Sequence, residues 1–194
     1  MTSVRDIPAT TNSVGVRLVA DADFRSIMAS FPSGVTVVTT LDAQGRPRGI
    51  TVSAFISVSA EPPMLAVCLA STSSTLAALK ETGSFATHVL AEDAEGIARQ
   101  FAKPGGGFDY FGWTPSQHAG GVPVLASGAV AVAECSVEAI VPAGDHDLVI
   151  GLIHGGRHSG ARPLVYHRRQ FSGWVDVVEA EFDLMRLAAD PLGA

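Results

Sequence analysis

A succession of β-branched runs joined by turns, rather than by long helices, constrains this chain most. Val35 to Leu41 is followed by a turn at 42–45, and a second run extends from Arg48 to Ser59. Further strand-like runs cover Met64–Ala70, Ser84–Leu90, Val122–Val141, Asp147–Gly155 and Leu164–Phe171. A parallel sheet needs a helix between successive strands, so this order predicts a mainly β, antiparallel fold. A closed or nearly closed barrel of this size has room for a small-molecule site at its rim.

Three short helices are expected, one before the first of these strands and two between them. Phe24, Ile27, Met28 and Phe31 have the i, i+3, i+4, i+7 spacing of one helical face, which Pro32–Gly34 ends. A second helix should extend from Thr75 to about Thr82 and stop at Gly83, and a third should span about Asp93 to Phe101. Lys103–Gly107 is expected to be a glycine-rich surface loop, because no strand leads into it.

Composition narrows the class of protein. The 194 residues suit one domain at 21–174, preceded by an arm (1–20) and followed by a C-terminal extension (175–194) in which a short helix is expected at Val177–Leu187. A net charge of −6 argues against nucleic-acid binding. Cys68 and Cys135 lie in apolar runs without a CxxC pattern, which favours free thiols in a reducing cytoplasm. Neither a signal peptide nor a membrane-spanning run is expected.

Gly144–Gly151 (GDHDLVIG) is the candidate site that stands out, because His146 lies between two acids at the head of an apolar run. Polar groups there are costly to bury without partners. A histidine that faces a ligand and a histidine tied to an acid in a turn fit this pattern equally well. The other histidines have no spacing that gathers them with His146 around a metal. No Gly-x-Ser-x-Gly or Gly-x-Gly-x-x-Gly pattern supports a serine hydrolase or a Rossmann domain.

Three other segments carry weaker signals. Ser71–Thr75 (STSST) lies between a strand and a helix, where hydroxyls and helix N–H groups favour an anion, although a simple N-cap needs only one of them. Thr51–Ala54 is a stretch of small and polar residues in an otherwise apolar strand. It fits either a strand edge that contacts a flat heterocycle or the ordinary alternation of a half-buried strand. Lys103 follows a predicted helix, where its charge could bind a phosphate or could interact only with the C-terminal end of the helix dipole. Taken singly, each segment favours the structural reading.

Together, these segments resemble the flavin reductase-like family, the small reductase components of two-component flavin-dependent monooxygenases. The resemblance covers about Asp23 to Trp174, and it rests on the order and spacing of several short motifs. These are Phe31–Thr40 (FPSGVTVVTT), Gly49–Phe55 (GITVSAF) with Ser57–Ser59, Pro62–Pro63, Cys68–Leu69, Gly144–His146 with Gly151, and Pro163–Tyr166 (PLVY).

The resemblance implies an antiparallel split β-barrel, usually a homodimer, that binds FMN or FAD. It implies reduction of that flavin by NADH or NADPH and delivery of the reduced flavin to a separate monooxygenase. Thr51, Val52, Ser53 and Ala54 would line the flavin ring, and Cys68, Leu69 and Ala70 would continue that wall. Ser73, Ser74 and Thr75 would hold the flavin phosphate, with Phe101 and Lys103 closing the phosphate or ribityl side. His146, the one catalytic candidate, would face the nicotinamide, with Tyr166 nearby.

Several residues, and the function itself, fit more than one interpretation of the sequence. His88 stands where the family often has asparagine, so no contact is assigned to it. Arg157, Arg162, Arg168 and Arg169 could meet a 2′-phosphate of NADPH or only solvent. The alternatives are a non-catalytic flavin-binding or electron-carrier protein on the same barrel, and a relative of the pyridoxamine-phosphate oxidases, for which a more basic pocket is expected.

Overall fold

The computed structural model describes residues 9–11, 17–103, 108 and 112–174. Its main sheet has seven strands in the order β5-β4-β8-β11-β12-β7-β6, and every neighbouring pair is antiparallel. The strands are β4 (Thr36–Leu41), β5 (Pro47–Val52), β6 (Phe55–Ala60), β7 (Pro63–Ala70), β8 (Ser84–Leu90), β11 (Ala129–Ala143) and β12 (His146–His158). This confirms the mainly β, antiparallel fold.

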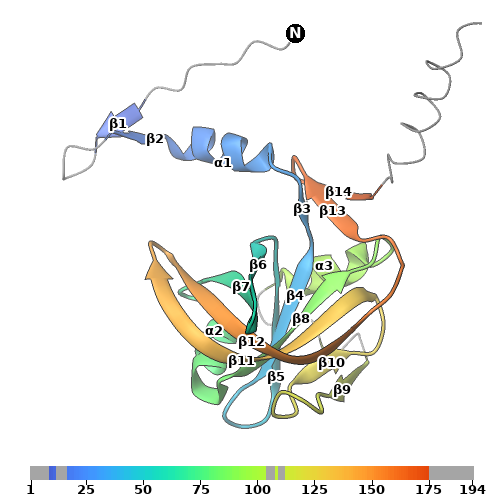
Figure 1. Ribbon diagram of the computed structural model, residues 1–194. Helices are drawn as coiled ribbons and strands as arrows, with labels where there is room; N and C mark the ends of the chain where they lie inside the picture. The colour runs from blue at the N-terminus through green and yellow to red at the C-terminus, as the bar shows by residue number, and fades with distance from the viewer. Residues whose placement is uncertain (1–8, 12–16, 104–107, 109–111, 175–194) are drawn as a thin grey trace, which may run out of the picture.

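The sheet is curled because its two outer strands are consecutive in the chain. Strands β5 and β6 stand at opposite ends of the strand order, yet only Ser53 and Ala54 lie between them. Three Cα–Cα steps span at most about 11 Å, so the two ends of the sheet must approach each other. The result is a barrel that is split between β5 and β6 (Figure 1). The prediction of one continuous strand from Arg48 to Ser59 is therefore wrong, because barrel closure breaks it at Ser53–Ala54.

The three predicted helices are present as α1 (Asp21–Ala29), α2 (Ser74–Thr82) and α3 (Glu95–Phe101). The Ser73 hydroxyl accepts a hydrogen bond from the Leu76 N–H, so it caps α2. Gly83, with φ of 69°, ends the helix in the left-handed conformation that glycine tolerates best. Residues 104–107 of the expected glycine-rich loop and the expected tail helix at 177–187 lie outside the described residues.

Three smaller sheets accompany the barrel. Strands β13 (Leu164–His167) and β14 (Gln170–Gly173) form a hairpin that pairs with β3 (Ser33–Gly34). The prediction of a single strand over Leu164–Phe171 is wrong, because the chain turns at Arg168 and Arg169, both with positive φ. The predicted run Val122–Val141 divides into β10 (Pro123–Leu125), paired with β9 (Trp113–Pro115), and β11. Strands β1 (Ala9–Thr11) and β2 (Arg17–Val19) pair within the expected arm.

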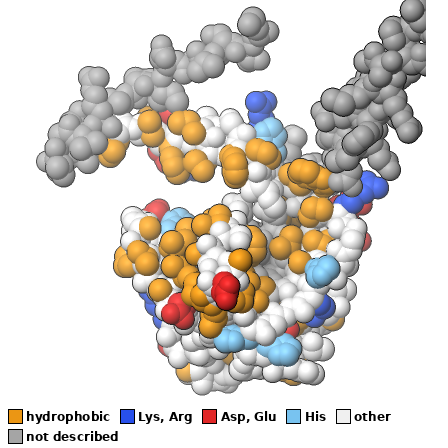
Figure 2. All heavy atoms as spheres, viewed as in Figure 1, with side chains coloured by type: hydrophobic (Ala, Val, Ile, Leu, Met, Phe, Trp, Pro, Cys, Tyr) orange, Lys and Arg blue, Asp and Glu red, His pale blue; other side chains and the backbone are white. Residues whose placement is uncertain are grey.

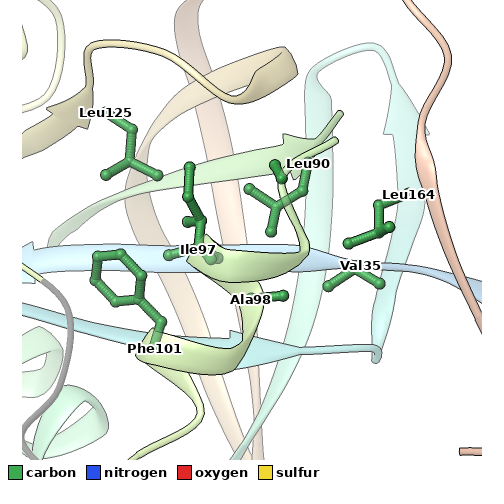
Figure 3. Close-up of a cluster of buried hydrophobic side chains, with 9 residues drawn as sticks. Val35, Leu90, Ile97, Ala98, Phe101, Leu125 and Leu164 are labelled. Atoms are coloured by element: carbon green, nitrogen blue, oxygen red, sulfur yellow. The ribbon is translucent and has the colours of Figure 1, made fainter. Parts of the chain in front are cut away.

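The core has two main parts. Inside the barrel, Val38, Leu69, Leu76, Phe85 and Val149 belong to one buried cluster. A second cluster lies where α3 covers the sheet: in Figure 3, Ile97, Ala98 and Phe101 of α3 lie among side chains from separate strands and loops. Those partners are Val35, Leu90, Leu125 and Leu164. Helix α3 is thereby fixed beside β5.

Helix α1 makes no comparable packing. None of its residues is buried, and it extends away from the barrel with β1 and β2 (Figure 1). The apolar face predicted from its sequence is exposed: Phe24, Ile27, Met28 and the following Phe31 retain 53%, 48%, 52% and 70% of their accessible surface. Figure 2 shows hydrophobic side chains on this arm and on the barrel surface opposite it. Helix α1 is thus an amphipathic helix whose apolar side is uncovered in the single chain.

Both cysteines are free. Cys135 is fully buried, and this burial raises the pKa of its thiol to about 12, whereas Cys68 is half-buried. No helix in the described part of the chain is both long and apolar enough to cross a membrane.

Candidate functional site

A pocket of about 500 Å³, here called the β5 pocket, opens where the barrel is split. Strand β5 and the break after it contribute Thr51, Val52 and Ser53. Helix α3 and the residues after it contribute Ala98, Arg99, Ala102 and Lys103. Val35 and the β13–β14 hairpin, through Tyr166, Arg169 and Phe171, complete the lining. The β5 pocket therefore brings together five of the predicted cofactor residues: Thr51, Val52, Ser53, Lys103 and Tyr166.

The walls of the β5 pocket are held by specific contacts. The Thr51 hydroxyl donates a hydrogen bond to the Ala98 carbonyl at 2.8 Å, which ties β5 to α3. The Tyr166 and Phe171 rings pack against each other at 5.0 Å between centroids, with a tilt of 50° between their planes, and the Arg99 guanidinium lies 5.1 Å above the Phe171 ring. Because Thr51 uses its hydroxyl on α3, its contribution to a ligand would come from the backbone. Strand β5 is an end strand of the sheet, so alternate backbone groups point away from β4.

A second hollow, here called the α1 groove, adjoins this pocket. It has a volume of about 590 Å³ and lies between α1, the start of β6 and the β13–β14 hairpin. Phe24, Met28 and Phe31 line one side, and Ala54, Phe55 and Ile56 line the other. Ser53, Tyr166 and Arg169 line both hollows, so the two are continuous at these three residues.

Charged side chains around the two hollows are all basic. The β5 pocket has Arg99, Lys103 and Arg169, the α1 groove has Arg25, Arg168 and Arg169, and no Asp or Glu lines either hollow. Arg99 and Arg25 have carboxylate partners on their own helices, Glu95 at 2.6 Å and Asp21 at 2.9 Å. In a chain of net charge −6, this arrangement creates a local positive potential that favours an anionic ligand.

Backbone hydrogen bonds connect the remaining predicted residues at the head of β12. The Cys68 N–H donates to the Ala54 carbonyl at 3.2 Å, and two residues further along β7, Ala70 is opposite His146. The Ser73 N–H donates to the Ala70 carbonyl at 2.8 Å. The group that includes Cys68, Ala70, Ser73 and His146 therefore lies within about two strand residues of Ala54, at the break between β5 and β6. Neither His146 nor Ser73–Thr75 lines the two hollows of the single chain.

His146 is oriented by its neighbours. Its Nδ1 is 2.7 Å from Asp145 Oδ1, and 44% of the side-chain surface is exposed. If Nδ1–H donates to the carboxylate, Nε2 is left for a ligand. The hydrogen bond with His146 lowers the pKa of the Asp145 carboxyl. Gly144, with φ of 67°, forms the turn before them.

Asp147 has a structural role. It is buried, and it accepts hydrogen bonds from Lys80 Nζ at 2.5 Å and from the Ser71 hydroxyl at 3.4 Å. The two acids beside His146 therefore differ: Asp145 contacts the imidazole, whereas Asp147 fastens the head of β12 to α2.

Three predicted cofactor residues have buried side chains. Leu69 and Phe101 are 1% exposed and Thr75 is 2% exposed, so their side chains are not available to a ligand in the single chain. The Phe101 ring instead packs against Phe108 at 5.0 Å, edge to face. Ser74 is exposed at the first turn of α2.

Sequence reasoning assigned no site role to Arg99 and Phe171, and it left Arg169 unassigned between solvent and a phosphate. The adjacency of Arg168 and Arg169 was the one available signal, since no other Lys or Arg residues are adjacent.

Comparison with known proteins identifies this arrangement. Residues 28–175 match the model of the flavin reductase like domain. The chain belongs to the flavin reductase-like family. It is 44% identical over 176 residues to a flavin reductase (NADH) of Kitasatospora aureofaciens, covering 89% of this chain and 92% of the relative. A flavin reductase (NADPH) of Lentzea aerocolonigenes is 37% identical over 80% of this chain and 91% of its own.

A solved structure extends the family assignment. The NADH:FAD oxidoreductase of Streptomyces globisporus, in complex with NAD and FAD fragments, superposes with a TM-score of 0.73 at 30% identity, covering 79% of this chain and 92% of the other. The β5 pocket of this flavin reductase-like chain suits a flavin nucleotide. Its volume is in the range of cofactor sites, its apolar wall of Val35, Tyr166 and Phe171 suits a flat ring, and its cations suit a phosphate.

Proposed function

We propose that the protein is an NAD(P)H:flavin oxidoreductase that reduces FMN or FAD and supplies the reduced flavin to a partner monooxygenase. The observation that carries the proposal is the β5 pocket, where the β5 backbone, the Tyr166 and Phe171 rings and three basic side chains meet and where no carboxylate lines the wall. Relatives of this chain are named as NADH- and NADPH-dependent flavin reductases, which favours the enzyme over a non-catalytic carrier.

The two bound nucleotides supply the chemistry themselves, with a hydride moving from C4 of the nicotinamide to N5 of the flavin. The protein contributes position, which accounts for a large part of the lowering of the barrier. The backbone of Val52–Ala54 would face the flavin ring, and Lys103 would meet its phosphate or ribityl chain as a point charge. The hydroxyls of Ser73 and Ser74 would add donors at the start of α2. No general base is required in this scheme.

His146 is assigned to the nicotinamide side. Its distance of two strand residues from the Ala54–Cys68 hydrogen bond supports a position beside the flavin ring rather than under it. Asp145 fixes the imidazole, so Nε2 can donate to or accept from the nicotinamide amide or a phosphate. In this role His146 orients the nucleotide and does not move a proton.

Anaerobic stopped-flow mixing tests the function. NADH or NADPH is mixed with the protein and FMN or FAD, and loss of the oxidised flavin absorbance is followed. Rapid bleaching is expected with at least one pair. His146→Ala should raise the KM for the nicotinamide nucleotide about tenfold, the value of one good hydrogen bond, and leave the KM for flavin unchanged.

His154→Ala is the matched control, because His154 is on the same strand and its Nε2 is bonded to Ser136 at 2.7 Å, away from the site. Absence of bleaching in the wild-type protein would favour the carrier alternative. Wild-type kinetics in His146→Ala would remove the nicotinamide role.

The active form is proposed to be a homodimer. Phe24 and Met28 on α1 and Ile56 and Val58 on β6 are between 46% and 56% exposed. Monomeric proteins rarely leave a contiguous apolar surface of this kind open. A second copy of the chain would cover the α1 groove. Because Ser53 and Tyr166 line both hollows, the partner subunit would also close one side of the flavin site.

The cytoplasm is the proposed location. Both cysteines of the chain are free, and the raised pKa of Cys135 keeps its thiol protonated, as suits a reducing compartment. Fractionation of the producing cells, followed by immunodetection, tests this assignment.

A further inference from the structure

The β13–β14 turn is built from two arginines in an unfavourable backbone conformation. His167 pairs with Gln170, so Arg168 and Arg169 are the two turn residues, with φ of 49° and 64°. Two-residue hairpin turns of this kind normally have Asn or Gly, because a side chain at positive φ is strained. Neither arginine is needed for the turn itself, and glycine would form it at lower cost.

This turn is held at the junction of the two hollows. The Arg168 N–H donates to the Ala29 carbonyl at 3.0 Å, which fixes the turn against the end of α1. Arg169 lines both the β5 pocket and the α1 groove, whereas Arg168 lines the groove alone. The strained backbone therefore sets one particular guanidinium beside Ser53 and Tyr166.

Arg169 also lacks a compensating charge. Among the described residues, the Arg169 side chain forms no hydrogen bond or ion pair. Lys103 is the second cation in the β5 pocket that has no carboxylate partner, and its ammonium group donates only to the Gln100 side-chain amide, at 3.2 Å. Two uncompensated cations that face one pocket repel each other until an anion binds between them. A guanidinium recognises phosphate oxygens by paired hydrogen bonds, which an ammonium group does not provide.

We propose that Arg169 binds a phosphate group of a nucleotide substrate and so selects phosphorylated nucleotides over their dephosphorylated analogues. This inference rests on the proposed function and deepens it. The phosphate belongs either to the flavin, in the β5 pocket, or to the nicotinamide nucleotide, at the junction of the two hollows that Ser53, Tyr166 and Arg169 line. The same side chain reaches both hollows, so the experiment has an arm for each source.

The test compares Arg169→Gly and Arg169→Lys with the matched control Arg168→Gly. Flavin fluorescence gives the Kd of FMN and of riboflavin at equilibrium, and steady-state kinetics give the KM of NADPH and of NADH. Arg169→Gly is expected to weaken binding of the phosphorylated member of one pair about tenfold and to leave the other member unchanged. Arg169→Lys should restore part of the loss. Arg168 lines only the α1 groove, so Arg168→Gly should leave the FMN-to-riboflavin ratio unchanged, and Arg162 lines neither hollow, so Arg162→Ala should leave the NADPH-to-NADH ratio unchanged.

Thermal unfolding separates this role from a structural one. Each glycine variant relieves one positive-φ side chain and should raise Tm by roughly 2–4 °C, so Arg169→Gly is expected to be more stable yet less selective. A loss confined to FMN assigns the flavin phosphate, and a loss confined to NADPH assigns the 2′-phosphate. An equal loss for both members of each pair, or none, overturns the proposal. If wild-type protein discriminates FMN from riboflavin but does not reduce either, the proposed function fails and the phosphate site stands.

Discussion

His88 is a buried histidine whose two ring nitrogens are both used inside the barrel wall. Its Nδ1 is 3.1 Å from the Val37 carbonyl, and the Leu125 N–H donates to its Nε2, also at 3.1 Å. Because an N–H must donate to Nε2, the proton resides on Nδ1. His88 thus joins β4, β8 and β10 as a neutral bridge. It lines neither of the two hollows, so its ring serves the barrel wall.

This bridge predicts a pH dependence of stability. Burial lowers the pKa of His88 from 6.5 to about 4. Below pH 6.5 the unfolded chain binds a proton that the folded chain does not, so the free energy of unfolding falls as pH falls. The loss begins near pH 6.5, is complete below about pH 4, and amounts to about 3 kcal/mol from this group.

Urea unfolding at several pH values between 7.5 and 4 checks this, with His88→Asn as the reference. The variant should be less stable at pH 7.5, and the difference between the two proteins should shrink as the pH falls. Parallel curves for the two proteins would contradict the assignment, because other acid-sensitive groups are common to both.

At the scale of elements, the packing of β12 on the barrel core requires a glycine at position 151. A Cβ at Gly151 would lie 2.4 Å from Phe85 Cζ, and Phe85 is fully buried. Gly151→Ala should therefore destabilise the protein by about 1–3 kcal/mol through overpacking. Gly96→Ala in α3 is the control, since a Cβ there meets nothing within 4 Å. That variant should be neutral or slightly stabilising, because alanine is the better helix former.

Thermal and urea unfolding measure both variants. Adding Phe85→Leu to Gly151→Ala should recover part of the loss, because it removes the ring atoms that the new methyl group meets. Equal stability of Gly151→Ala and wild type would show that Phe85 can move aside.

The position of β12 also depends on the ion pair between Lys80 of α2 and Asp147 of β12. Asp147 is buried, whereas the Lys80 side chain is 47% exposed, so loss of the acid and loss of the base are not equivalent. Asp147→Ala should cost about 1–3 kcal/mol, because it leaves the Ser71 hydroxyl and the ammonium group without their acceptor. Lys80→Ala should cost less than about 1 kcal/mol, as expected for a half-exposed partner. A double-mutant cycle measures the coupling, and a coupling of zero would deny that the pair holds β12 to α2.

Element bounds were predictable wherever local chemistry sets them. Strand β8 has the predicted bounds, and α2 begins one residue before the predicted start and ends as predicted at Gly83. The two wrong strands have a common cause. Ser53–Ala54 and Arg168–Arg169 contain no Gly, Pro or Asn, so nothing local marks a break. The first break results from barrel closure, and the second uses strained arginines where a turn residue is normal.

For the whole molecule, the main lesson concerns charge. The basic residues are scattered along the sequence, and from that scatter a basic pocket was not expected. The fold nevertheless gathers Arg99, Lys103 and Arg169 at one pocket, because α3 and the β13–β14 hairpin flank the split between β5 and β6. Thr51, Val52, Ser53, Lys103 and Tyr166 came from the family resemblance. The remaining lining residues depend on strand order, which pattern and composition do not contain.

The uncovered face of α1 leads to the prediction at the largest scale. If a second copy covers the α1 groove, the wild-type protein should sediment as a dimer at micromolar concentration. Phe24→Glu combined with Met28→Glu should give a monomer, because both side chains line the groove and two buried carboxylates would oppose association. The barrel itself should keep its stability, since α1 has no buried residue.

Ala22→Glu on the same helix is the control, because Ala22 is exposed and lines neither hollow. Since Ser53 and Tyr166 line both hollows, the monomeric variant should also bind FMN more weakly than the control does. Analytical ultracentrifugation and flavin fluorescence on the same samples measure the two effects together. A monomeric wild-type protein, or a dimer that survives both glutamates, would reject the α1 groove as the interface. A monomer with unchanged FMN affinity would instead show that one chain builds the whole flavin site.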